Sequence, residues 1–133
     1  MKLVLELTEE QARVMNNALD LYARVWIGQI EQPFHMLRIF GRKSITDAKH
    51  FEKEREAIDT LFKLYFSELP VGASYGISAP ETEENAKIAY DINQVVRNKI
   101  AWHNNPEGDY TVDFHEPSKT SATQELPKAE IKE

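Results

Sequence analysis

The sequence predicts an α+β domain in which a small antiparallel sheet packs with two or three long helices. Three long stretches carry apolar residues at helical spacing, and two short segments alternate apolar with other residues. Loops that contain Gly and Pro separate these stretches. We expect one α+β domain over residues 1–116. Ser, Thr, Lys, Glu and Pro dominate residues 117–133, which we expect to form a disordered polar tail.

The N-terminal part predicts a strand followed by a helix. Leucines occupy every second position of residues 3–7, which is typical of a short strand with one apolar face. Thr8 and Gln11 match a capping box, and apolar residues then recur at helical spacing as far as Ile30. Because proline lacks an N–H, we expect Pro33 to end or bend this helix.

Two further helices and a second strand are predicted. One helix follows capping residues at 44–47 and stops before Pro70, and another runs from Pro80 to Asn104. The apolar face of the latter helix is expected to bury Ala89, Ile92, Val95, Val96 and Ile100. Apolar residues alternate with polar ones again over residues 110–114. We expect them to form a C-terminal strand that pairs with the N-terminal one, since an isolated strand would not be stable.

Composition narrows the classes of function. The chain has 133 residues, which suit one domain, and it has no Cys, which excludes disulfides, thiolate metal sites and Cys nucleophiles. We find no signal peptide or membrane span and expect a cytoplasmic protein that does not bind membranes. The net charge of −6 disfavours DNA binding, but a few local arginines are enough for a small anionic ligand.

The loop from Gly72 to Pro80 is the most informative candidate site. It places the ring of Tyr75, next to Gly76, just before a predicted helix N-terminus, where free N–H groups attract phosphate. An aromatic ring there can stack on a base. Asn85 lies early enough in that helix to face the same ligand or simply to point at water. An ordinary connection between two helices has the same pattern.

Polar residues on the predicted helices extend this candidate site. Tyr90, Gln94 and Arg97 share one side of the third helix, and Trp102 lies near its end. They could contact a nucleotide, or they could form a partly solvated helix face. In the first helix, Arg24 has the spacing of an ion pair with Asp20.

Two further features of the first helix bear on the site. Gln29 is a polar residue on an apolar side and must pair with a protein group or a ligand. Tyr22 and Trp26 form an aromatic stripe that is more typical of a core.

The sequence offers little support for catalysis. The four His residues are scattered, and His50 with Glu54 is too small a set of ligands for a metal site. The chain contains no nucleophile elbow, phosphate-binding loop or dinucleotide-binding fingerprint. We therefore expect a protein that is not an enzyme and that needs no metal and no cofactor.

Five stretches together resemble a known family. They are residues 7–12 (Leu-Thr-Glu-Glu-Gln-Ala), 18–24 (Ala-Leu-Asp-Leu-Tyr-Ala-Arg), 27–29 (Ile-Gly-Gln), 73–77 (Ala-Ser-Tyr-Gly-Ile) and 86–92 (Ala-Lys-Ile-Ala-Tyr-Asp-Ile), the last continuing to Arg97 and Trp102. In their order they resemble the phage proteins that counter the bacterial Thoeris defence, of the first described type. The resemblance covers most of residues 2–116. Residues 35–43 match nothing in the family, and Trp26 stands where a smaller residue is expected.

The resemblance implies a sponge for a signalling nucleotide. Such proteins bind cyclic ADP-ribose-type messengers (gcADPR) without cleaving them, assemble as dimers or assemblies of dimers, and in some cases hold cyclic oligonucleotides. It also implies a small antiparallel sheet with long helices. The implied ligand-binding residues are Arg24, Gln29, Tyr75, Gly76, Asn85, Tyr90, Arg97 and Trp102.

The resemblance also implies individual roles. Arg24 and Arg97 would contact the pyrophosphate, and Tyr75 would stack. Two other functions stay open. One is a small helical protein–protein interaction module that inhibits a host protein, and a weaker one is an enzyme of the phosphodiesterase kind that destroys the signal.

Overall fold

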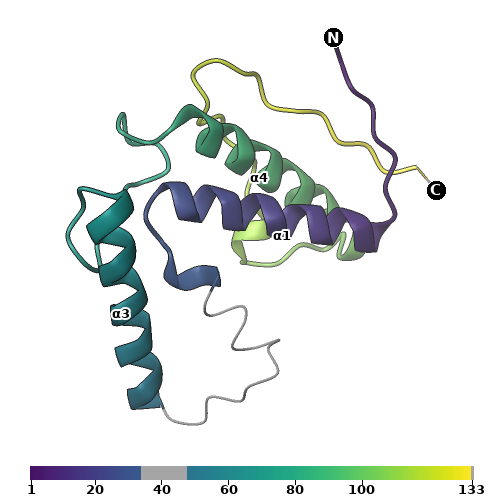
Figure 1. Ribbon diagram of the computed structural model, residues 1–133. Helices are drawn as coiled ribbons and strands as arrows, with labels where there is room; N and C mark the ends of the chain where they lie inside the picture. The colour runs from purple at the N-terminus through teal and green to yellow at the C-terminus, as the bar shows by residue number, and fades with distance from the viewer. Residues whose placement is uncertain (34–47, 133) are drawn as a thin grey trace.

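The computed structural model describes residues 1–33 and 48–132 and shows a helical protein. The elements in these ranges are α1 (Glu9–Trp26), α3 (Ala48–Phe66), α4 (Glu84–Asn104) and a 3₁₀ turn, η1 (Val112–Phe114). The described residues contain no strand, so the predicted α+β class is wrong and this part of the chain is all-α. Figure 1 shows α1 and α4 side by side, while α3 stands apart from both.

Both predicted strands lack a partner in the described part of the chain. Residues 1–8 are extended, but they pair with no other segment there, and Leu3 is 85% exposed. In the second predicted strand, residues 110–114, the chain turns tightly, since the Phe114 N–H donates to the Thr111 carbonyl oxygen at 3.1 Å. A strand gains most of its stability from neighbouring strands, so the alternation of apolar residues was not sufficient to form a strand here.

The start of α1 is confirmed, whereas its end differs from the prediction. The Thr8 hydroxyl accepts a hydrogen bond from the Gln11 N–H at 3.2 Å, and the Gln11 side chain accepts one from the Thr8 N–H at 2.9 Å. The helix ends at Trp26 because Gly28 adopts a left-handed φ of 91°, which glycine tolerates best. Gly28, rather than Pro33, therefore ends the helix. Similarly, α4 begins at Glu84 rather than at Pro80.

Small residues let α1 and α4 pack together. Ala23 of α1 and Ala86 and Ala89 of α4 are buried, and they are among the few fully buried apolar residues of the described chain. Alanine side chains allow two helix backbones to approach closely, but each one buries little area. None of the described helices has the length and apolarity needed to cross a lipid bilayer.

A buried ion pair attaches α3 to the rest of the protein. Lys63 Nζ donates to the carbonyl oxygens of Gly28 and Ala73, both at 2.7 Å, and lies 3.2 Å from Asp59 Oδ1. Asp59 Oδ2 accepts a hydrogen bond from the Gly72 N–H at 2.6 Å. The pair thus joins α3 to the turn that follows α1 and to the loop that precedes α4.

Residues 115–127, here called the C-terminal strap, run back along α4 (Figure 1). Asp91 of α4 accepts hydrogen bonds from the backbone N–H groups of Thr120 and Ser121, and Gln94 bonds to both backbone groups of Ser118. We expected a disordered polar tail from residue 117, whereas these hydrogen bonds place residues 118–121 against α4 in the structure. The Ser and Thr residues of the strap supply donors to side chains of α4.

Glu84 makes the attachment of the strap dependent on pH. Hydrogen bonds from the Ser121 hydroxyl and then from Thr123 lower the pKa of Glu84 from 4.5 to about 2. Because the folded-state pKa is depressed, this contribution to stability is complete above about pH 4.5 and is lost as the pH falls toward 2. We expect the melting temperature of Glu84→Gln to fall less between pH 5 and pH 2 than that of the wild type. Parallel melting curves over this range would contradict this role of Glu84.

Candidate functional site

A depression lies between α1, α4 and η1. This α1–α4 hollow has a volume of about 550 Å³, within the usual range of small-molecule sites. Its lining is mostly polar and comprises Arg13, Asn16, Asn17, Asp20, Arg24, Asn93, Arg97, Ile100, Ala101, Asn104, Asn105, Asp113 and Phe114. Arg24 and Arg97, which are far apart in the sequence, both line it.

Arg24 is held in place by its neighbours on two sides. Its Nε donates to Asp20 Oδ2 at 2.8 Å, and its Nη1 donates to Gln29 Oε1 at 2.6 Å. Gln29 reaches Arg24 because the turn at Gly28 brings the chain back over the last turn of α1, where the Gln29 N–H bonds to the Arg24 carbonyl oxygen at 2.8 Å. These contacts orient the guanidinium and leave its side chain 36% exposed.

Arg97 is held more loosely than Arg24. Its guanidinium lies 5.8 Å from the centre of the Tyr90 ring, and its Nε is 3.8 Å from Asp113 Oδ1. The latter distance is too long for a hydrogen bond, so the Asp113 carboxylate neutralises Arg97 without fixing it. A phosphate oxygen could approach to about 2.8 Å and bind more strongly.

A third arginine and two buried amides complete the polar wall. Arg13 lines the hollow and bonds to Glu9 at 2.6 Å; hydrogen bonds from Arg13 and then Asn104 lower the pKa of Glu9. Asn93 donates to the Asn16 backbone carbonyl oxygen at 3.0 Å, but the Oδ1 atoms of both asparagines are buried without a partner. An unpaired buried acceptor costs about 1–3 kcal/mol. A hydroxyl or amino group of a bound molecule could pair with one after a side-chain rotation.

The predicted site residues fall into two groups. Arg24 and Arg97 line the hollow, while Gln29 and Tyr90 contact these two arginines. The other four predicted residues, which are Tyr75, Gly76, Asn85 and Trp102, do not line it.

Local contacts explain where three of these four residues lie. The Tyr75 N–H bonds to the Ile27 carbonyl oxygen at 2.9 Å, and the Gly76 carbonyl oxygen accepts from the Thr82 hydroxyl at 2.7 Å. Trp102 packs edge-on against Phe114, with ring centres 5.2 Å apart. The loop thus belongs to the junction with α3, and Trp102 supports η1.

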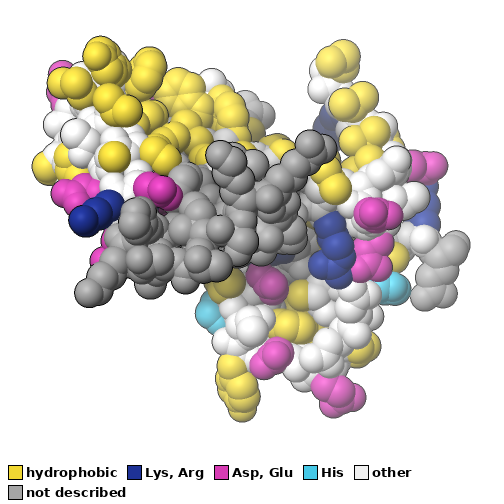
Figure 2. Space-filling view, turned by 60° about the horizontal axis from the view of Figure 1, so that its bottom comes forward, with side chains coloured by type: hydrophobic (Ala, Val, Ile, Leu, Met, Phe, Trp, Pro, Cys, Tyr) yellow, Lys and Arg dark blue, Asp and Glu magenta, His cyan; other side chains and the backbone are white. Residues whose placement is uncertain are grey.

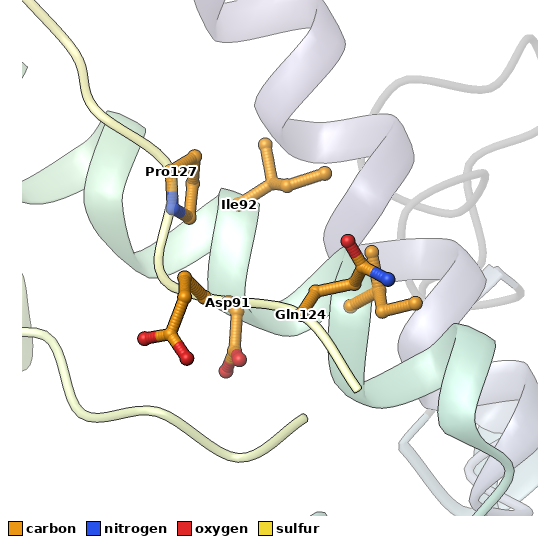
Figure 3. Close-up of a pocket in the computed structure, with 6 residues that line it drawn as sticks. Asp91, Ile92, Gln124 and Pro127 are labelled. Atoms are coloured by element: carbon orange, nitrogen blue, oxygen red, sulfur yellow. The ribbon is translucent and has the colours of Figure 1, made fainter. Parts of the chain in front are cut away.

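A smaller pocket of about 200 Å³ lies between α4 and the C-terminal strap. Figure 3 shows Asp91 and Ile92 on α4 facing the strap residues Gln124 and Pro127. The Asp91 carboxylate is already occupied by the strap N–H groups, and the volume is below that of usual ligand sites. We therefore take the α1–α4 hollow as the candidate site.

Sequence reasoning missed most of the polar wall. Arg13, Asn16, Asp20 and Arg24 follow one another at spacings of three or four, and Asn93, Arg97 and Asn104 share a face of α4. This regularity was visible in the sequence. Of the residues proposed as ligand contacts, only Arg24 and Arg97 line the hollow, and Arg13 and the asparagines of the wall were not among them.

Comparison of the chain with protein-family models, with curated proteins and with solved structures finds no match. Within residues 1–33 and 48–132, acidic and histidine side chains form no cluster suited to a metal ion.

Proposed function

We propose that this protein binds a cyclic ADP-ribose-type nucleotide and sequesters it without cleaving it, as a phage counter-defence protein in the host bacterial cytoplasm. The observation that carries the proposal is that Arg24 and Arg97 line one hollow of about 550 Å³. The sequence resemblance to the Thoeris anti-defence proteins supports the same ligand class. The larger cyclic oligonucleotides are a second proposed ligand of this class.

Binding would rest on the arginines and the asparagines. The guanidinium groups of Arg24 and Arg97 would contact the two phosphates of the ligand, with Gln29 and Tyr90 holding these arginines in position. Donor groups of the ribose or the base would pair with the asparagine carbonyl oxygens. None of these contacts breaks a bond in the ligand, so the proposed mechanism is binding alone.

Sequestration requires tight binding rather than catalysis. A nanomolar Kd corresponds to about −12 kcal/mol. Charge-assisted hydrogen bonds contribute about 1.5–3 kcal/mol each, so several arginine contacts could supply a large share of that free energy. The protein must also be present at a higher concentration than the messenger.

We also propose that the protein forms a homo-oligomer, either a dimer or an assembly of dimers. On α3, Leu61, Leu64, Tyr65 and Phe66 are 58–78% exposed. Figure 2 shows hydrophobic side chains gathered at the left, where α3 and the following loop lie, and others near the N-terminus. Exposed apolar surface of this kind is typical of interaction sites.

The same apolar surface favours the alternative function. A helical interaction module would bind a host protein through α3, and the α1–α4 hollow would then have no ligand. The two functions differ in whether a nucleotide is retained, which a single experiment can decide.

The test is retention of an intact nucleotide. The purified full chain is incubated with cyclic ADP-ribose isomers, separated from free ligand, denatured by heat and analysed by chromatography. Intact nucleotide that is released only on heating supports the proposal. Altered nucleotide would identify an enzyme, and no retention of any isomer would favour the interaction module.

We expect Arg24→Ala and Arg97→Ala each to weaken nucleotide binding by about 10- to 100-fold, because each loses a charge-assisted contact to phosphate. Arg55→Ala is the matched control, since it removes the same charge from an exposed position on α3, outside the hollow. Calorimetric titration measures the affinities, and thermal melting checks that each variant is folded. Equal affinities for all three variants would refute the proposed site.

A further inference from the structure

The η1 turn brings a carboxylate to one of the arginines of the α1–α4 hollow. Asp113 is half exposed, and its Oδ1 lies 3.8 Å from Arg97 Nε. Asn98 positions the turn by donating to the carbonyl oxygens of Asp113 and His115, both at 2.9 Å. On its other side Phe114 packs on Trp102. The carboxylate is therefore delivered to Arg97 by the fold, from a segment outside both helices that line the hollow.

The other acidic residue of the hollow is placed differently. Asp20 lies on α1, one helical turn from its partner Arg24, and bonds to it at 2.8 Å. Its backbone is fixed within α1. Asp113, in contrast, is carried by a three-residue turn and makes only a loose pair with Arg97. Asp113 is thus the acidic group of this wall that a ligand could displace most easily.

We propose that Asp113 is a built-in competitor of the ligand for Arg97, and that η1 moves away when an anionic ligand binds. This inference rests on the proposed function and adds a regulatory element to the same site. Before binding, the carboxylate neutralises a guanidinium that would otherwise attract any phosphate compound. A pyrophosphate group can contact Arg97 with two oxygens at hydrogen-bond distance and so replaces the carboxylate, whereas a weaker anion does not.

The balance of charged side chains in the α1–α4 hollow sets the expected change in affinity for an anionic ligand. Three arginines and two aspartates line the hollow. Glu9 pairs with Arg13, Asp20 with Arg24 and Asp113 with Arg97, so removing the Asp113 charge leaves one positive charge, that of Arg97, uncompensated and removes the competing group. Exposed ion pairs are weak, so the gain in affinity should be modest.

The test is titration of the wild type and of Asp113→Asn with inorganic pyrophosphate by calorimetry. We expect Asp113→Asn to bind pyrophosphate about three- to tenfold more tightly than the wild type. Asp109→Asn is the matched control, because it makes the same charge change four residues earlier, outside the hollow. Its carboxylate caps the Tyr110 N–H, a bond that asparagine can keep.

Trp102 provides a second readout of η1. In a Trp26→Phe background Trp102 is the remaining tryptophan, and its contact with Phe114 makes its emission sensitive to movement of the turn. We expect saturating pyrophosphate to change the emission of Trp102 in the wild-type site, and the change to be smaller in Asp113→Asn.

The outcomes separate the inference from the proposed function. Equal affinity of Asp113→Asn and the wild type, an equal gain in Asp109→Asn, or binding without a change in Trp102 emission would overturn the inference alone. The same holds if neither protein binds pyrophosphate while the wild type retains a cyclic ADP-ribose isomer. Failure to retain any isomer would overturn the proposed function.

Discussion

Replacing Lys63 with methionine is expected to destabilise the protein by about 3–5 kcal/mol, because it leaves the buried Asp59 carboxylate without its cation. The side chains of Lys63 and Asp59 are only 4% and 6% exposed. Lys63 also donates to the carbonyl oxygens of Gly28 and Ala73, which would lose their partner. Chemical denaturation followed by circular dichroism measures the loss.

Two further variants make this test specific. Lys53→Met removes the same charge from an exposed position on α3 and should change stability by less than about 0.5 kcal/mol. Adding Asp59→Asn to Lys63→Met should recover part of the loss, since asparagine removes the buried charge and can still accept from the Gly72 N–H. A loss below about 1 kcal/mol in Lys63→Met would show that this pair does not hold α3 in place.

Replacing Asp91 with alanine is expected to release the C-terminal strap and to cost about 3 kcal/mol. The carboxylate accepts hydrogen bonds from the N–H groups of Thr120 and Ser121 and from the Thr120 hydroxyl, at 2.7–3.1 Å. Hydrogen bonds to a charged group contribute about 1.5–3 kcal/mol, and the buried Ser121 N–H would be left unpaired. Thermal melting measures the loss of stability.

The rate of cleavage by trypsin measures directly whether the strap is released. The side chains of Lys119 and Lys128 are already exposed, so release should act by freeing the backbone around them to enter the protease, and it should speed cleavage beyond α4 in Asp91→Ala. Glu125→Ala is the control, because it removes an exposed carboxylate of the strap that pairs only with Lys119 at the surface. If Asp91→Ala resists trypsin as well as this control does, Asp91 is not what holds the strap.

The sequence was enough to name Arg24 and Arg97 as site residues, but it could not show that they line the same hollow. Arg97 was a candidate from its spacing with Tyr90 and Gln94, whereas a phosphate-binding role for Arg24 was implied only by the family resemblance. The loop around Tyr75 looked equally suitable, yet the structure places it at the α3 junction, where its backbone bonds to Ile27. Sequence distance says nothing about which segments lie across from one another. Only the packing of α1 on α4 brings Arg24 and Arg97 to one hollow.

The buried face of α4 was predicted only in part, since Ala89 is buried as expected but other buried residues were missed for a related reason. Helical spacing predicted burial of Ile92 and Val96, whereas Asp91, Asn93 and Gln94 are buried more deeply. Asp91 and Gln94 are covered because the strap lies over them with backbone groups that need partners. A rule based on hydrophobic periodicity cannot anticipate a polar interface of this kind.

The sequence by itself determined the features that depend on neighbouring residues. The capping box at Thr8 begins α1, the apolar repeat over Ala48–Phe66 forms α3, and the break after Asn104 ends α4. Their hydrogen bonds and side-chain contacts lie within a few residues, so local chemistry is enough.

Only the tertiary structure decided the features that need a distant partner. Residues 3–7 and 110–114 did not become strands, because strands form only where another backbone supplies their hydrogen bonds. The strap lies against α4 because Asp91 supplies such bonds from about thirty residues away. The α1–α4 hollow likewise exists only once the two helices and η1 are assembled.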